Sequence, residues 1–146
     1  MEFTRGDKTI WRLLIAIFIV PTLVFLGLIF WPLNPLEIRS VTIQNPNKTV
    51  VMGEPIYFEV HYVKHTDKHG RVYRQLLNER VVNYRPHTSH VPRGENKGIS
   101  VLHTGTGESP GLYQVSYTVV YKYFGFREVT VNALSDEFTI VPRSKK

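Results

Sequence analysis

The sequence of 146 residues contains no cysteine, so it forms no disulfide, carries no thiolate nucleophile and holds no metal through sulfur. Outside one apolar run near its N-terminus, it has no stretch with helical periodicity. A catalytic pattern is also missing: Ser89 and His90 are adjacent, and on a strand adjacent side chains point to opposite faces. We therefore expect a protein that is not an enzyme, binds no cofactor and depends on packing for its stability.

One long apolar run dominates the N-terminal part of the sequence. From Leu13 to Trp31, nineteen positions pass without a charged side chain. As a helix rising about 1.5 Å per residue, this run covers about 29 Å, close to the roughly 30 Å hydrocarbon core of a bilayer. The two tryptophans of the chain, Trp11 and Trp31, stand at its ends, where amphipathic rings favour the headgroup level. The run predicts one transmembrane helix, anchored by Trp11, Arg12 and Trp31.

The charges beside this run predict its orientation. Arg5, Lys8 and Arg12 precede it, whereas the next basic residue after it is Arg39. Lysine and arginine accumulate on the cytoplasmic side of membrane spans, so we expect a cytoplasmic N-terminus. A cleaved signal peptide is the alternative, but it has a shorter apolar region followed by a small-x-small site, and the segment Phe30–Pro35 contains none. The run is therefore expected to remain as an anchor.

The rest of the sequence is rich in short alternating segments separated by turn residues. We expect a cytoplasmic tail at 1–12, the transmembrane helix at 13–31, a linker at 32–35, a β-sandwich at 36–142 and a basic C-terminal tail at 143–146. The fold class is all-β, an antiparallel sandwich of about seven strands preceded by one N-terminal transmembrane helix. The main strands are expected at 36–44, 56–64, 71–77, 98–104, 112–124, 126–131 and 137–141.

Two of these segments alternate strongly enough to predict which face is buried. Ile56, Phe58, Val60 and Tyr62 share one face of the first, and Tyr113, Val115, Tyr117, Val119 and Tyr121 share one face of the second. Residues 78–97 contain one apolar pair and several prolines and charges, so we expect one short strand and a long irregular connection there. Residues 132–136 are expected to interrupt the sheet as a bulge or irregular turn.

One segment resembles a known class of domain. Ser109-Pro110-Gly111-Leu112-Tyr113-Gln114-Val115 resembles the start of the penultimate strand of immunoglobulin-like and fibronectin-like domains, where a tyrosine at the corner pins the chain. Gly53-Glu54-Pro55-Ile56 and Phe138-Thr139-Ile140 suit the second and last strands of such domains. The resemblance covers about 36–142, without the two cysteines and the core tryptophan of true immunoglobulin domains. It implies an immunoglobulin-like fold with a binding, adhesion or assembly role.

Histidines supply the candidates for a metal site. His65, His69, His87 and His90 lie in predicted turns and connections, where they could converge. Zinc and copper sites need three or four ligands in a defined geometry, and this spacing matches no established motif. Solvent-exposed loop histidines are the more common case, so we expect no metal site.

Basic residues concentrate in the middle of the predicted sandwich, in a chain with a net charge of +6. They outnumber the three acidic residues of the same stretch, and they are Lys64, Lys68, Arg71, Arg74, Arg80, Arg85, Arg93 and Lys97. One interpretation is a surface that binds lipid head groups, an anionic envelope polymer or an acidic protein. The other is an ordinary solvated face. Nucleic acid is not an expected partner, because the domain is predicted to lie outside the membrane.

The sequence therefore predicts a single-pass membrane protein with an extracytoplasmic interaction module. Its expected partners are membrane lipid and another envelope or membrane protein, which it would bind as an accessory or assembly component through a sheet edge or loop. The alternative is a periplasmic module that handles metal or binds an anion, such as a lipid head or envelope polymer. A third hypothesis is a modifier of a host envelope encoded by a virus or mobile element.

Overall fold

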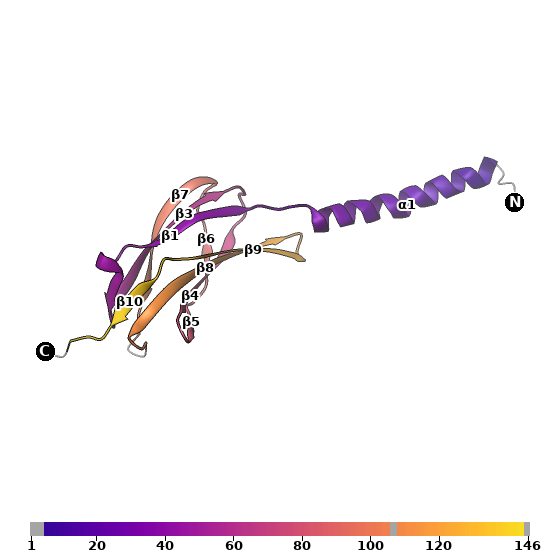
Figure 1. Ribbon diagram of the computed structural model, residues 1–146. Helices are drawn as coiled ribbons and strands as arrows, with labels where there is room; N and C mark the ends of the chain where they lie inside the picture. The colour runs from indigo at the N-terminus through magenta and orange to yellow at the C-terminus, as the bar shows by residue number, and fades with distance from the viewer. Residues whose placement is uncertain (1–4, 106–107, 145–146) are drawn as a thin grey trace. The chain divides into compact units, whose positions relative to one another are not determined.

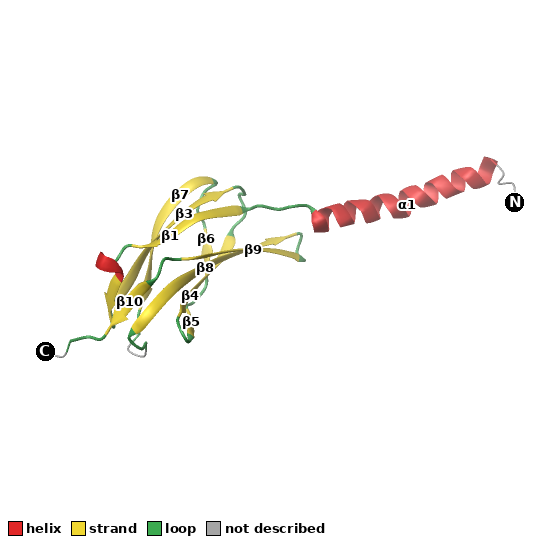
Figure 2. Ribbon diagram, viewed as in Figure 1, coloured by secondary structure: helices red, strands yellow, loops and turns green. Residues whose placement is uncertain are grey.

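The computed structural model describes residues 5–105 and 108–144, and the side chains from residue 9 onwards (Figure 1). The chain divides into two units, Met1–Leu33 and Asn34–Lys146. The first unit contains the helix α1, Arg5–Phe30, and the second contains ten strands (Figure 2). The ends of the predicted tails, residues 1–4 and 145–146, lie outside the described residues.

Helix α1 includes most of the apolar run and extends it towards the N-terminus. It begins at Arg5 rather than at Leu13, so the predicted tail is helical from Arg5 onwards, and it ends one residue before Trp31. The stretch Thr9–Phe30 is long and apolar enough to cross a membrane, with a mean hydropathy of 2.9 and none of it buried by other parts of the protein. The helix is therefore one candidate membrane span. Pro21 lies inside it, as membrane helices tolerate.

The smaller sheet of the second unit has three antiparallel strands in the order β1-β3-β7. These strands are β1 at Leu36–Ile43, β3 at Pro55–Lys64 and β7 at Gly94–His103. Strand β3 pairs with β7 along its whole length, from Pro55 opposite His103 to Lys64 opposite Gly94. Strand β7 is consequently an edge of this sheet.

The larger sheet contains the other seven strands. Its order is β2-β10-β8-β4-β5, with β6 also paired to β4 and β9 also paired to β8. Its strands are β2 at Thr49–Val51, β4 at Gly70–Leu77, β5 at Val81–Asn83, β6 at His87–Ser89, β8 at Gly111–Tyr123, β9 at Arg127–Leu134 and β10 at Phe138–Val141. Strands β2 and β10 run parallel and the other pairs are antiparallel.

The core lies between the two sheets. Both faces predicted from alternation are buried, including Ile56, Phe58 and Val60 on β3 and the five predicted residues of β8. The rings of Phe58 and Tyr117 meet edge to face across the sheets, with centroids 6.3 Å apart. Burial raises the pKa of the Tyr117 and Tyr121 hydroxyls to about 12. The apolar side chains of β3 and β8 thus hold the sheets together.

The structure corrects three details of the predicted strands. The described residues contain ten strands rather than about seven. Thr49–Val51 forms the additional strand β2, and 78–97 holds β5, β6 and the start of β7 instead of one short strand and a long connection. Strand β9 continues to Leu134, so the predicted interruption at 132–136 begins only at Ser135, and residues 135–137 form the irregular connection to β10. Its Asn132 carboxamide oxygen accepts hydrogen bonds from the hydroxyls of Ser116 and Thr118 on β8, so polar side chains support the pairing there.

Candidate functional site

The predicted basic surface is not one surface in the structure. Lys64 is buried, and Arg74 is half-buried, with its guanidinium bonded to the carbonyl of Val101. The others are exposed but dispersed, with Lys68 and Arg71 by one groove, Arg80 by another cavity, Arg85 and Arg93 in connections and Lys97 on β7. The prediction that all eight form one partner surface is wrong for Lys64, which is buried.

Lys64 lies on the core face of β3, in register with Tyr62 and Val60. Its side chain is 2% exposed, and its ammonium donates a 2.6 Å hydrogen bond to the carbonyl oxygen of Val91. A lysine has three donors and a strongly hydrated charge, so burial requires such an acceptor. The residue ties the connection after β6 to the smaller sheet, which is a structural role.

Arg74 and Tyr84 reach from the larger sheet to the outer edge of β7. The Arg74 guanidinium donates a 3.3 Å hydrogen bond to the carbonyl of Val101, and the Tyr84 hydroxyl donates a 3.2 Å bond to the carbonyl of His103. Burial, followed by the charge of Glu108, raises the pKa of Tyr84 to about 12, so this hydroxyl keeps its proton at neutral pH. These two side chains cover the edge of β7 near its C-terminal end.

The remaining length of this edge is open, as the register shows. The carbonyl of Tyr57 accepts a hydrogen bond from the backbone N–H of Gln44 on the β1 side. Tyr57 and Val101, which lie opposite each other, are therefore a non-hydrogen-bonded pair of the β3–β7 ladder. Because hydrogen-bonded and non-hydrogen-bonded pairs alternate, every second residue of β7 counted from Val101 points its N–H and C=O away from β3. Ile99 and Lys97 are two of these residues. Among the described residues, no side chain covers the edge at these two positions.

The side chains along this open stretch are exposed, and a cavity lies beside it. Ile99 is 68% exposed, Gly98 presents no side chain, and Lys97 faces solvent. A cavity of about 310 Å³ is bounded on one side by Gly98, Ile99 and Ser100 and on the other by the 87–91 segment. We call Lys97–Ile99 with this cavity the β7 edge site. An edge strand with free donors and acceptors can pair with another strand.

A charged cluster lies on the outer face of the smaller sheet, next to the β7 edge site. Glu95 accepts hydrogen bonds from His61 at 2.7 Å and from Arg39 at 3.2 Å. The hydrogen bond with His61 and then the charge of Arg39 lower the pKa of the Glu95 carboxyl. Its carboxylate thus stays ionised and neutralises much of the positive charge here, which leaves Lys97 as the cation nearest the open edge.

A basic groove lies on the outer face of the larger sheet. It has a volume of about 520 Å³, and its lining includes Lys68, His69, Arg71, Tyr73 and Lys122. The Arg71 guanidinium lies over the Tyr73 ring at 5.6 Å, which orients the cation while leaving its donors open. We call this feature the basic groove. The sequence indicated Lys68 and Arg71 but not Lys122, which comes from a strand distant in the chain.

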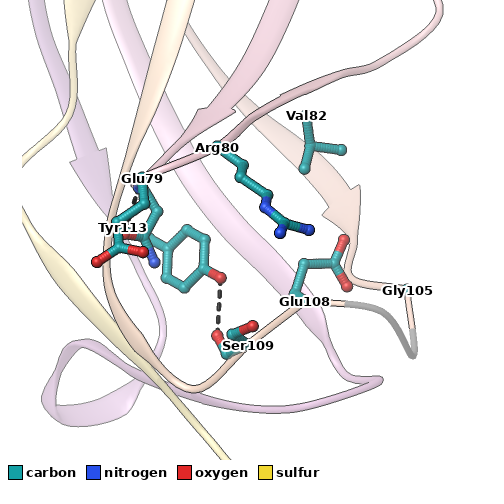
Figure 3. A pocket seen from close by; sticks show the side chains of 8 residues that line it. Glu79, Arg80, Val82, Gly105, Glu108, Ser109 and Tyr113 are labelled. Carbon is teal, nitrogen blue, oxygen red and sulfur yellow. Dashed lines mark hydrogen bonds between the residues drawn. The ribbon is translucent and has the colours of Figure 1, made fainter.

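A second cavity of about 500 Å³ lies where β5 approaches the turn before β8 (Figure 3). The side chain of Arg80 points towards Glu108 across it. Beside it, the Tyr113 hydroxyl donates a 2.7 Å hydrogen bond to the carbonyl of Ser109, four residues upstream (Figure 3). This bond pins the turn to the start of β8, as the resemblance to immunoglobulin-like domains implied for this tyrosine.

The four candidate histidines do not converge. His69 and His90 lie together, with ring centroids 4.7 Å apart. His65 instead lies 4.0 Å from Glu37, and burial followed by the charge of Arg74 lowers the pKa of His87. Among the side chains that the structure describes, in residues 9–105 and 108–144, no group of three or more histidine or acidic side chains is placed to hold a metal ion.

Comparison with known proteins assigns no family. No family model matches the sequence, and no curated protein matches it. Among solved structures, a β-glucosidase from Listeria innocua in complex with laminaribiose is similar over 73% of this chain at 14% identity, with a TM-score of 0.44. This chain spans 16% of the length of that enzyme.

Two further solved structures show likenesses of the same order. A CARDB domain from Pyrococcus furiosus, solved with di-metal ions, is 17% identical, with 73% of this chain and 89% of that chain covered and a TM-score of 0.41. The DNA glycosylase AlkC of Pseudomonas fluorescens, bound to DNA, is 12% identical, with 89% and 36% covered and a TM-score of 0.44. Such similarities assign neither a family nor an activity.

Proposed function

We propose that the protein is an extracytoplasmic interaction module with an immunoglobulin-like fold, held to a membrane by α1, that binds another envelope protein by adding a strand to the edge of β7. The excess of basic residues before the span supports a cytoplasmic N-terminus. The hydrogen bond from Tyr113 to Ser109 supports the immunoglobulin-like class, because it reproduces the corner that such domains use.

The observation that carries the proposal is the open stretch of the β7 edge site. Arg74 and Tyr84 cover the edge at Val101 and His103, but no described side chain does so at Lys97 and Ile99. Natural sheets protect their edges, so an uncovered stretch with an exposed isoleucine marks a place for pairing. The adjoining cavity of about 310 Å³ offers room for a side chain of the added strand.

The register supplies a substitution that removes strand addition and spares the fold. Ile99→Pro deletes an N–H that points away from β3, so the β3–β7 ladder keeps all of its bonds. The loss of this hydrogen bond, and of the strand pairing beside it, should weaken the binding of the partner by about tenfold. Ile99→Ala is the matched control, because it removes the side chain and keeps the N–H.

The measurement is lysine cross-linking with mass spectrometry on the full-length protein in its native membrane. We expect one dominant partner protein, linked through Lys97, and loss of this link in Ile99→Pro but not in Ile99→Ala. The compartment of the partner reports on which side of the membrane the β unit lies. A Lys97 link that survives Ile99→Pro, or links only between copies of this chain, would contradict the proposal.

A further inference from the structure

The tip of the β8–β9 hairpin presents an aromatic cluster to solvent. Phe124 and Phe126 are 53% and 55% exposed, and their rings lie 6.2 Å apart. The ring of Tyr123 adjoins that of Phe124 at 6.3 Å. We call Tyr123–Phe126 the aromatic tip. Two neighbouring exposed phenylalanines at the end of a projecting hairpin are costly in water and suit an apolar environment (Figure 1).

The backbone of the aromatic tip is strained at Phe124 in a way that glycine, which has no Cβ, would relieve. Phe124 has a φ of +54°, in the left-handed region that a bulky side chain rarely adopts, and Gly125 follows with a φ of +75°. Glycine at position 124 would avoid the steric cost of about 1 kcal/mol. A phenylalanine held in this conformation indicates that its side chain has a use at the tip.

The aromatic tip lies at the same end of the β unit as the start of β1. Leu36, the first residue of β1, lines a small cavity together with Lys64 and Tyr121, and Tyr121 precedes the tip by two residues. Figure 1 shows the hairpin projecting beyond the sheet at this end. The five residues 31–35 that lead from α1 to β1 reach about 18 Å at most when fully extended. This end of the β unit is therefore tethered close to any bilayer that α1 spans.

Cations lie beside the aromatic tip and along the stem of its hairpin. The ammonium of Lys68 lies 5.0 Å from the centre of the Tyr123 ring, and Lys122 and Arg71 line the basic groove that continues along the stem of the hairpin. Glu128 pairs with Lys122 at 3.1 Å and is the one acidic residue among those that line the groove. Aromatic side chains flanked by lysine and arginine are the combination that binds anionic membrane surfaces.

We propose that the aromatic tip enters the headgroup region of the membrane that α1 spans, and that the basic groove binds the phosphates of anionic phospholipids there. The occupant is an anionic lipid surface, because the tip lies at the tethered end and the charge beside it is positive. The contact fixes the orientation of the β unit on the membrane. It leaves the β7 edge site free for a protein partner.

The absence of cysteine allows a direct test in the full-length protein. Phe126→Cys and Leu112→Cys each create a single labelling site, and the replaced side chains are 55% and 54% exposed at opposite ends of β8 and its hairpin. Each variant carries a nitroxide label in nanodiscs of phosphatidylcholine with or without phosphatidylglycerol. Oxygen is enriched in lipid, whereas a nickel chelate stays in water. The accessibility of the spin label to each of them therefore reports whether the label is immersed in the membrane.

We expect the label at 126 to be oxygen-accessible and nickel-protected in discs with phosphatidylglycerol, and the label at 112 to remain in water. Lys68→Gln and Lys122→Gln should each lower the ratio of immersed to free label by about fivefold in those discs only. A label at 126 as nickel-accessible as the label at 112 would overturn the proposal. Immersion that is equal in both lipids would overturn the assignment to anionic lipid.

A further variant separates lipid binding from folding. Phe124→Gly removes one ring of the aromatic tip. It also removes the steric cost of a side chain at positive φ, so the thermal midpoint of the β unit should not fall. Immersion of the label at 126 should nevertheless decrease by about fivefold or more, because the labelled protein already lacks Phe126 and Phe124 is its remaining exposed phenylalanine at the tip. Unchanged immersion in this variant would show that the ring is not the inserting group, contrary to the proposal.

Discussion

Gly70 offers a sharp test of how the larger sheet is packed. It precedes Arg71, which pairs with Val120, so it lies opposite Tyr121 on β8. A Cβ added at Gly70 would lie 2.5 Å from a methyl carbon of Val119 and 2.9 Å from Cζ of Tyr121. Neither neighbour can easily move, because Val119 is restricted at χ1 and both side chains are buried, at 3% and 2% exposed. The ring thus lies over the glycine and fills the space of a missing side chain.

The expected cost of Gly70→Ala follows from this clash. Forcing an extra methyl group into a packed core costs about 2 kcal/mol, which lowers the unfolding midpoint of a domain of this size by roughly 10 °C. Gly98→Ala is the matched control, since Gly98 is also a strand glycine without a positive φ and has no atom within 4 Å of an added Cβ. It should stabilise the protein by about 0.5 kcal/mol through the unfolded state.

The assay is thermal unfolding of the full-length protein in detergent, followed by circular dichroism at a wavelength dominated by the strands. The difference between the two alanine variants is the informative quantity, because detergent and α1 contribute equally to both. If Gly70→Ala melted at or above the midpoint of Gly98→Ala, the close packing of β4 against Tyr121 would be refuted.

Two further perturbations test contacts that hold the turns. Tyr113→Phe removes the hydrogen bond at the start of β8 and should lower the free energy of unfolding by about 1 kcal/mol. Tyr121→Phe is the control, because it loses no hydrogen bond among the described residues, and it should cost far less. Equal losses in the two variants would contradict a role for the Tyr113–Ser109 bond. Partial burial acts to raise the pKa of Asp136, but hydrogen bonds from Lys48 and from a backbone N–H outweigh it and lower that pKa. The stabilisation by this carboxylate is therefore complete above its ordinary pKa of 3.8 and is lost as the pH falls through the lowered value. Asp136→Asn should flatten the loss of stability in denaturant melts over that acidic range, and an unchanged pH profile would show that the carboxylate contributes nothing.

The sequence predicted the parts of the fold in which alternation and burial coincide. Strands β3 and β8 alternate apolar and polar residues over most of their length, and the structure buries the predicted faces. The N-terminal half of β7 escaped prediction because Gly94–Lys97 contains no apolar side chain and lies at an edge, where pairing rather than burial makes the strand. The polar support of β9 by Asn132 was missed for a similar reason.

The candidate site was harder to predict, because it depends on register and on residues distant in the chain. Lys64 and Arg74 could have been assigned to the interior, since each has the parity of buried neighbours on its own strand. They were expected on the surface only because their side chains are charged. The open stretch of the β7 edge site depends on which carbonyls Arg74 and Tyr84 cover, and no sequence pattern contains that information.

The central claim is that a partner protein pairs with the β7 edge site, and site-specific photo-cross-linking tests it most directly. A photoreactive amino acid is placed at position 99 or at position 112 of the full-length protein in its native membrane. Both positions are exposed, and only the first lies on the open edge. We predict one heterologous protein cross-linked from position 99 and none from position 112. The same proteins captured from both positions, or no protein captured from position 99, would contradict the account.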